Sequence, residues 1–373
     1  MPNQVSAVDA ISPAFARMWQ LLFRPFHFGL WARLAVVAIV TGETSGGGGA
    51  SLPNFNNNRS GDNHWAAVGH LISEPGWDQI QPYMSWIILG GLAVLGLILL
   101  WIYSDCVYRF ILLDTVISGE CRLREGWRKW KEIGAQYFYW ALTYAFGALV
   151  SVGLLIGLPV LLAFRAGWFE KSDQHIGALI LGGLLLMLLV FVLVATLAVI
   201  DLLARDFLVP VMAFEDVGPW DGWRRLLPML GADKLAFGAY ILMKIVLAVG
   251  SAILFTIVNL IVILILLIPL TLLGVAGYFA GRGAGINWDA SAILLVAALG
   301  MLALAGILYV VGFVYAPGLV FFQSYTLEFF AGRYEPLRNR MSQAGAPTAP
   351  APPVVNPPRM PIPPWPSSEP STT

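Results

Sequence analysis

Long apolar stretches separated by short polar segments dominate the hydrophobic pattern of the chain. They lie near 28–42, 86–104, 137–164, 177–200, 236–280 and 291–316. A helix needs about 20 apolar residues to cross about 30 Å of hydrocarbon. The pattern therefore predicts an all-α integral membrane protein with about six transmembrane helices. The stretch 28–42 is short and contains Arg33, whereas 236–280 is long enough for one bent span or for two.

Two segments of the chain repeat at a constant offset of 96 residues. Each has an aspartate and an arginine four residues apart, followed by an acidic-Gly-Trp-Arg-basic element, and a fainter copy at 14–19 opens the chain. Such repetition indicates a repeated structural unit. We expect three units, about 8–104, 122–200 and 218–316, each an amphipathic interfacial helix followed by a transmembrane hairpin. The matched residues are Asp105, Arg109, Glu125, Gly126, Trp127, Arg128 and Lys129 in one copy and Asp201, Arg205, Asp221, Gly222, Trp223, Arg224 and Arg225 in the other.

The helix that opens each unit combines tryptophan with basic residues. In the first, Phe15, Trp19, Leu22 and Phe23 are expected on one face, opposite the basic residues. A helix of this type next to a span lies at the level of the lipid headgroups. It serves either as a topological anchor or as a site that recognises anionic lipid headgroups. The candidate headgroup contacts are Arg17, Trp19, Trp127, Arg128, Lys129, Trp223, Arg224 and Arg225.

Several charged residues fall in or beside the apolar stretches. The spacing of Asp105 and Arg109, and of Asp201 and Arg205, predicts an ion pair on one helix face where a span leaves the membrane. These pairs are either local pairs at the rim or a coupling site in which both aspartates face a shared cavity. Arg33 and Lys244 lie deeper, which makes them functional-site hypotheses with Asp105 and Asp201 as candidate partners. Alternatively, the two basic side chains extend to the membrane surface.

Composition and charge distribution support a membrane location. The chain is 58% hydrophobic and only 12% charged, with a mean hydropathy of +0.73, whereas soluble domains are about 25% charged. The net charge is zero, so no basic field argues for nucleic acid. With six spans and a cytoplasmic N-terminus, 16 Lys and Arg residues face the cytoplasm and 4 face outward. This positive-inside bias predicts a cytoplasmic membrane protein with both termini in the cytoplasm.

Two segments differ in composition from the membrane domain, which we place at 1–342. The Gly- and Asn-rich segment 43–80 is typical of an exterior loop. Residues 343–373 contain 11 of the 24 prolines and are typical of a disordered cytoplasmic tail. Such a tail can dock a protein partner through an aromatic groove, or it can have no partner.

No pattern of catalytic or metal-binding residues emerges from the sequence. The four histidines are scattered, and Cys106 and Cys121 are 15 residues apart with no neighbouring cysteine. Phosphate-binding loops and nucleophile motifs of the Gly-x-Ser-x-Gly type are absent. We therefore expect a non-enzymatic protein without a cofactor, whose two thiols are reduced.

The segment Leu123–Trp130, which follows a span and introduces a hairpin, carries a family resemblance. It resembles uncharacterised prokaryotic membrane families related to the membrane domain attached to some glycerophosphoryl diester phosphodiesterases, over roughly residues 8–340. The resemblance implies an all-helical polytopic fold. It implies no catalytic residues, because the phosphodiesterase chemistry of those proteins resides in a separate soluble domain that this sequence does not contain.

Two functions remain open from the sequence. The first is a non-enzymatic protein that binds or organises lipid through the tryptophan-bearing helices. The second is a transporter or permease-like protein with a site between the repeats. A transporter predicts a water-accessible cavity lined by Arg33, Lys244, Asp105 or Asp201. A scaffold predicts a close-packed apolar interior with these charges at the rim.

Overall fold

The computed structural model describes residues 6–24, 26–42, 84–168, 172–283 and 290–345, and every regular element in these ranges is helical. The predicted loop 43–80 and nearly all of the predicted tail lie outside the described residues. The elements are α1 (Ile11–Phe23), α2 (Phe28–Val40), α5 (Met84–Ser118), α6 (Leu123–Arg165), α7 (Ser172–Leu203), the π-helical η3 (Ala204–Leu208), α8 (Val209–Glu215), α9 (Pro219–Ala232), α10 (Lys234–Gly283), α11 (Ala290–Ala331) and α12 (Glu335–Gly345).

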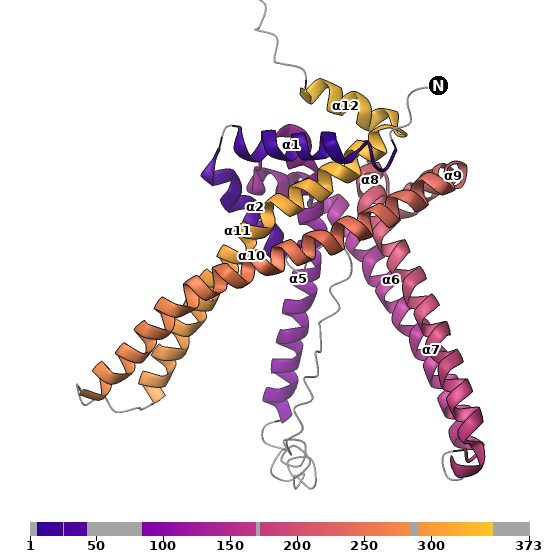
Figure 1. Cartoon of the computed structure of the whole chain (residues 1–373), viewed down its shortest axis with the longest axis horizontal. Coiled ribbons are helices and arrows are strands. Elements are labelled where there is room, and N and C mark those ends of the chain that lie inside the picture. Colours follow the sequence, from indigo (N-terminus) through magenta and orange to yellow (C-terminus); the bar gives the residue numbers. More distant parts are fainter. Residues whose placement is uncertain (1–5, 25, 43–83, 169–171, 284–289, 346–373) are drawn as a thin grey trace, which may run out of the picture.

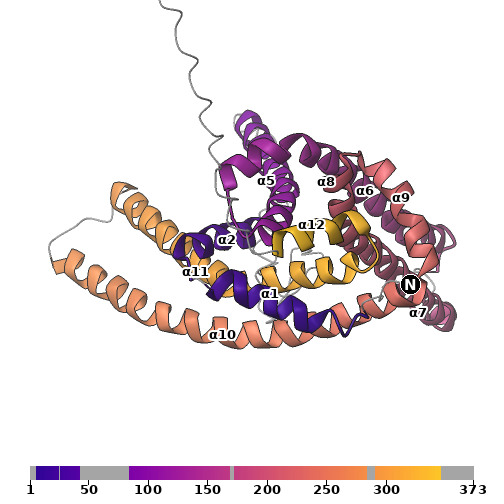
Figure 2. The same cartoon turned by 90° about the horizontal axis from the view of Figure 1, so that it is seen from above.

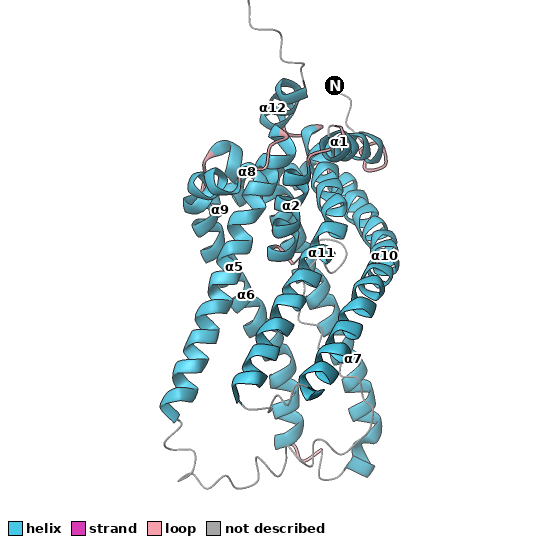
Figure 3. Ribbon diagram, turned by 90° about the vertical axis from the view of Figure 1, so that its left-hand side faces the viewer, coloured by secondary structure: helices cyan, strands magenta, loops and turns pink. Residues whose placement is uncertain are grey.

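The molecule consists of a packed head and three apolar legs that diverge from it (Figure 1). The legs are α5, the pair α6 and α7, and the pair α10 and α11, and Figure 3 shows all of them extending from the same end of the molecule. The head contains α1, α2, α8, α9, α12 and the adjoining ends of the long helices. Viewed from above, α1 lies across α11 (Figure 2).

Five helices in the described part of the chain are long and apolar enough to cross a membrane. They are α5, α6, α10, α11 and the continuous run Leu179–Glu215 through α7, η3 and α8. The predicted first span is represented by α2, which has 13 residues and is therefore only about 20 Å long. Helix α2 lies in the head, whereas α5 begins at the far end of its leg (Figure 1).

The long apolar stretch 236–280 forms a single helix. This helix, α10, has 50 residues and includes Pro269 without a break. Its length of about 75 Å is more than twice the thickness of the hydrocarbon layer. Figure 1 shows α10 running obliquely from the head to the far end of its leg. The structure thus favours one long span over two short ones.

Each leg presents apolar side chains on all sides. On α5, the exposed side chains include Leu89, Leu92, Leu95, Leu97 and Ile98, which at about 3.6 residues per turn lie on all sides of the helix. A helix that is hydrophobic all round requires an apolar environment such as lipid. The buried core lies instead in the head, where aromatic rings from α10 and α11 stack. The ring of Tyr240 lies 5.3 Å from that of Tyr325 and 4.6 Å from that of Phe329.

Glycines let the tryptophan-bearing helices approach the preceding span in the same way in two of the expected units. A Cβ on Gly126 would lie 3.0 Å from Ile111, and one on Gly222 would lie 2.6 Å from Leu208. The two glycines are 96 residues apart, but their contacts are 97 apart. The π-helical turn η3 accounts for the extra residue, because a π turn holds one more residue than an α turn. The connection from Leu208 to Gly222 is one residue shorter than the connection from Ile111 to Gly126, so the two glycines are again 96 residues apart.

Candidate functional site

The two Asp-x3-Arg motifs form ion pairs where the legs join the head. Arg109 donates through Nε and Nη2 to Asp105 at 3.1 and 3.0 Å. Arg205 donates through Nε to Asp201 at 3.0 Å, and its Nη2 lies 2.8 Å from the second carboxylate oxygen. Both pairs have the spacing of four residues that the sequence analysis used. They leave each aspartate about one-fifth exposed, at 23% and 20%.

Lys244 does not pair with either of the aspartates proposed from the sequence. Its Nζ donates to both carboxylate oxygens of Asp206 at 2.6 Å, and Lys244 is only 5% exposed. The candidate partners Asp105 and Asp201 were therefore wrong for this residue, and so was extension of Lys244 to the membrane surface. One signal pointed to Asp206. It occupies the position that Phe110 holds in the other repeat, so it is an acid that one copy lacks.

The π-helical turn η3 determines how Arg205 and Asp206 are used. The two residues are adjacent, yet Arg205 contacts Asp201 on α7 whereas Asp206 contacts α10. A π turn is rare and occurs often at functional sites, since it redirects side chains within an otherwise regular helix. The hydroxyl of Tyr240 on α10 also donates to Asp206, at 2.9 Å. It lies 2.7 Å from the hydroxyl of Thr326 on α11.

A small, largely enclosed cavity lies at the centre of these contacts. Its volume is about 20 Å³. Three of the charged residues identified from the sequence line it, namely Arg109, Arg205 and Lys244. The other three, Asp105, Asp201 and Arg33, are not among its lining residues. The lining residues are Thr41, Arg109, Leu112, Arg205, Asp206, Val209, Lys244 and Gln323.

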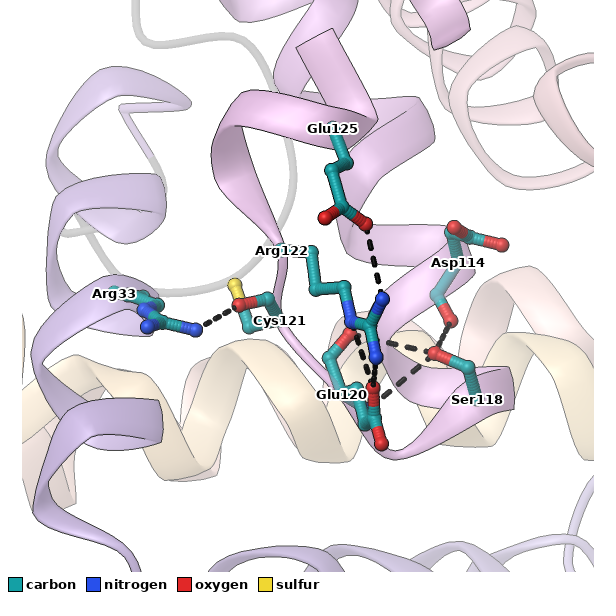
Figure 4. Close-up of polar contacts among 7 residues, drawn as sticks. All are labelled: Arg33, Asp114, Ser118, Glu120, Cys121, Arg122 and Glu125. Atoms are coloured by element: carbon teal, nitrogen blue, oxygen red, sulfur yellow. Dashed lines mark hydrogen bonds and ion pairs between the residues drawn. The ribbon is translucent and has the colours of Figure 1, made fainter.

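Arg33 is held at the turn between α5 and α6. Its Nη1 donates to the carbonyl oxygen of Cys121 at 2.6 Å (Figure 4), so a carboxylate of Asp105 or Asp201 is not its partner and that expectation was wrong. In the same turn, Arg122 pairs with Glu120 at 2.7 Å and with Glu125 at 3.0 Å. Burial raises the pKa of the Cys121 thiol above its usual value, which keeps it protonated and slow to react.

Helix α1 carries two apolar stripes. One is buried in the head, and the other is exposed apart from an edge contact of Phe23 with Trp31 on α2, with ring centroids 5.5 Å apart. Ala14, Met18 and Leu22 are buried. The aromatic side chains of Phe15, Trp19 and Phe23 remain 52%, 43% and 37% exposed, and we call them the aromatic stripe. Trp19 and Phe23 stack with ring centroids 4.4 Å apart. Leu22, which the sequence analysis grouped with the aromatic residues, belongs to the buried stripe.

Basic residues proposed as headgroup contacts divide into paired and exposed groups. Arg17 on α1 lies 3.3 Å from Glu328 on α11 and is mostly covered. Lys129 lies 3.3 Å from Asp114, and Arg225 pairs with Glu215. Arg224, whose side chain is 82% exposed, pairs loosely with Asp221 at 3.3 Å. Arg128 is exposed on α6.

The other two proposed tryptophans pack against the head. Trp127 meets Tyr103 and Tyr108 edge-on, with ring centroids 5.8 and 5.6 Å apart. Trp223 on α9 lies 6.0 Å from Trp140 on α6. This contact joins α9 to α6.

Comparisons with known proteins identify a family but no function. A model of a family of unknown function (DUF7544) matches residues 5–340. It carries no link to glycerophosphoryl diester phosphodiesterases. No curated protein and no solved structure matches the chain. In the described segments, no group of three His, Cys, Asp or Glu side chains is placed to hold a metal ion.

Proposed function

Because the chain belongs to DUF7544, a family of unknown function, we propose its role from its own geometry. We propose a non-enzymatic, multi-pass protein of a prokaryotic cytoplasmic membrane that binds anionic lipid headgroups at the inner leaflet. The head faces the cytoplasm, and three repeated units contribute six passes of the chain. The resemblance to the membrane domain of glycerophosphoryl diester phosphodiesterases remains part of this proposal.

The aromatic stripe of α1 is the observation that carries the proposal. Phe15, Trp19 and Phe23 lie exposed on a helix that crosses the direction of the legs at their head end (Figure 1). Aromatic side chains in this position are typical of the membrane–water interface. A helix lying in the interface, next to apolar legs, places the neighbouring surface at the level of the headgroups.

Exposed basic residues at the same end of the molecule supply the attraction to anionic lipid. Arg128 on α6 and Arg224 on α9 are exposed, and α9 lies in the head (Figure 1). Each basic residue near an anionic leaflet contributes about 1 kcal/mol. The partners of Arg17 and Arg225 are carboxylates of the head itself, so we assign those two residues to packing instead of lipid binding.

Lipid co-purification tests this proposal. The protein is extracted from bacterial membranes in a mild detergent, and the retained phosphatidylglycerol is counted by native mass spectrometry. We expect the double variant Arg128→Gln, Arg224→Gln to retain less phosphatidylglycerol than the wild type. Arg282→Gln, which removes an exposed cation at the far end of α10, is the matched control. Equal retention by all three proteins contradicts the proposal.

A permease-like role is the second candidate, because the Asp206–Lys244 pair is buried next to a π-helical turn. An ion-coupled permease needs such a charge pair to change protonation or partner during its cycle. Proteoliposomes loaded with a pH-sensitive dye test this role. A proton leak that Asp206→Asn abolishes supports it, and no leak in the wild type at any imposed pH gradient removes it.

A further inference from the structure

We propose that the enclosed cavity in the head binds one monatomic anion of the halide type, such as chloride. The cavity lies where α2, α5, η3, α8, α10 and α11 meet, and each of these elements contributes to its wall. It is separate from the exposed surface to which we assign lipid binding. The inference therefore does not depend on the proposed function.

The charges around the cavity favour an anion. Three cationic side chains, Arg109, Arg205 and Lys244, line it, and Asp206 is the one carboxylate in the lining. Both oxygens of Asp206 are already engaged by Lys244. The three cations and their three partner aspartates balance in number, but the two arginines line the cavity and their aspartates do not, so the positive ends of these ion pairs face it. Charges in a site shielded from water interact more strongly than charges in bulk solvent, so this arrangement favours an anion inside.

The aspartates that compensate the two arginines do not line the cavity. Arg205 engages Asp201 through Nε and Nη2, which leaves its Nη1 group for another acceptor. Gln323 on α11 adds a side-chain amide that can donate two hydrogen bonds. The hydroxyl of Thr41 already donates to the carbonyl oxygen of Val37 at 2.9 Å, so Thr41 contributes shape and no donor.

The size of the cavity decides which anion fits. A volume of about 20 Å³ exceeds the space needed for one water molecule, which is about 10–15 Å³. A single water molecule or a monatomic anion matches this space more closely than a phosphate, a sulfate or a carboxylate ligand. The positive potential favours the anion over the neutral water molecule.

A bound halide would hold the six elements of the head together. A ligand that binds only the folded head stabilises it in proportion to the logarithm of its concentration. The test measures the midpoint of thermal unfolding of the full chain in detergent, in sodium chloride, sodium bromide or sodium gluconate at equal ionic strength. Gluconate serves as the control because it is too large for the cavity.

We expect chloride and bromide, but not gluconate, to raise the unfolding midpoint with saturation. At a tenfold excess over the dissociation constant the rise is about 3 °C. Bromide should also give an anomalous X-ray scattering peak inside the cavity. Equal midpoints in all three salts, with no bromide peak, mean that the cavity holds water only and overturn the proposal.

Two variants of lining residues distinguish halide binding in the cavity from halide binding at the protein surface. Gln323→Leu removes a donor, and Val209→Leu fills the space with a larger side chain, so both should weaken or abolish the halide effect. Arg282→Gln removes an exposed cation elsewhere and should leave the effect unchanged. A halide effect that disappears in Arg282→Gln and persists in both lining variants overturns the proposal.

Discussion

Asp206 and Lys244 form a buried salt bridge that the sequence analysis did not predict. Asp206 is 8% exposed and Lys244 is 5% exposed, so each charge depends on the other for its compensation. The sequence analysis identified Lys244 because a cation in an apolar stretch is expensive. It assigned Asp105 or Asp201 as the partner, because the orientation of Asp206 depends on a π-helical turn that the local sequence pattern does not predict.

Removing one member of this pair should destabilise the head. In Asp206→Asn, the Lys244 ammonium loses its counter-charge and remains buried, which costs about 3–5 kcal/mol. The unfolding midpoint in detergent measures the effect. Asp221→Asn, which breaks the exposed pair with Arg224, is the control and should cost about 1 kcal/mol or less. Similar losses in both variants would show that the Asp206–Lys244 pair is solvated.

The glycines of the repeated elements make a second prediction for single residues. Gly222→Ala places a methyl group 2.6 Å from Leu208 and should cost about 1–3 kcal/mol. Gly231→Ala lies on the same helix with open space around it and should be neutral or slightly stabilising. The unfolding midpoints of the two variants provide the comparison. Equal midpoints would contradict the close contact between α9 and the preceding span.

At the scale of elements, the sequence predicted the long helices well because their apolar composition is sufficient to define them. It predicted less of how they pack. α1 shows the reason, since its buried Met18 and its exposed Trp19 are both apolar. Apolar residues are favoured both in lipid and in the protein interior. Hydrophobicity alone therefore does not show which stripe of α1 contacts lipid and which contacts protein. The same limit applies to α2, a helix of 13 residues whose apolar sequence packs against α11.

The two stripes of α1 should respond differently to substitution. Replacing Phe15 and Trp19 by serine should raise hydrogen exchange of the α1 amides in lipid nanodiscs and leave the unfolding midpoint of the head unchanged in detergent. Met18→Ser should lower that midpoint, because Met18 is buried. If the double variant lowers the midpoint as much as Met18→Ser does, the aromatic stripe packs on protein and not on lipid.

The whole molecule combines a head held by buried charges and aromatic stacking with legs that contact one another little beyond their own hairpins. The sequence predicted the long apolar helices that form the legs. It did not predict that the legs diverge. Their angles depend on packing in the head between residues far apart in the chain, such as Arg17 and Glu328. No local pattern encodes that information.

Cysteine labelling in intact cells tests the central claim most directly. Arg282→Cys places a thiol at the far end of α10 and Ser342→Cys places one on α12 in the head, while the native Cys106 and Cys121 are buried and should not react. We predict that a membrane-impermeant maleimide labels position 282 in intact cells and position 342 only after permeabilisation. Labelling of both positions in intact cells, or of position 342 alone, would contradict a head on the cytoplasmic side.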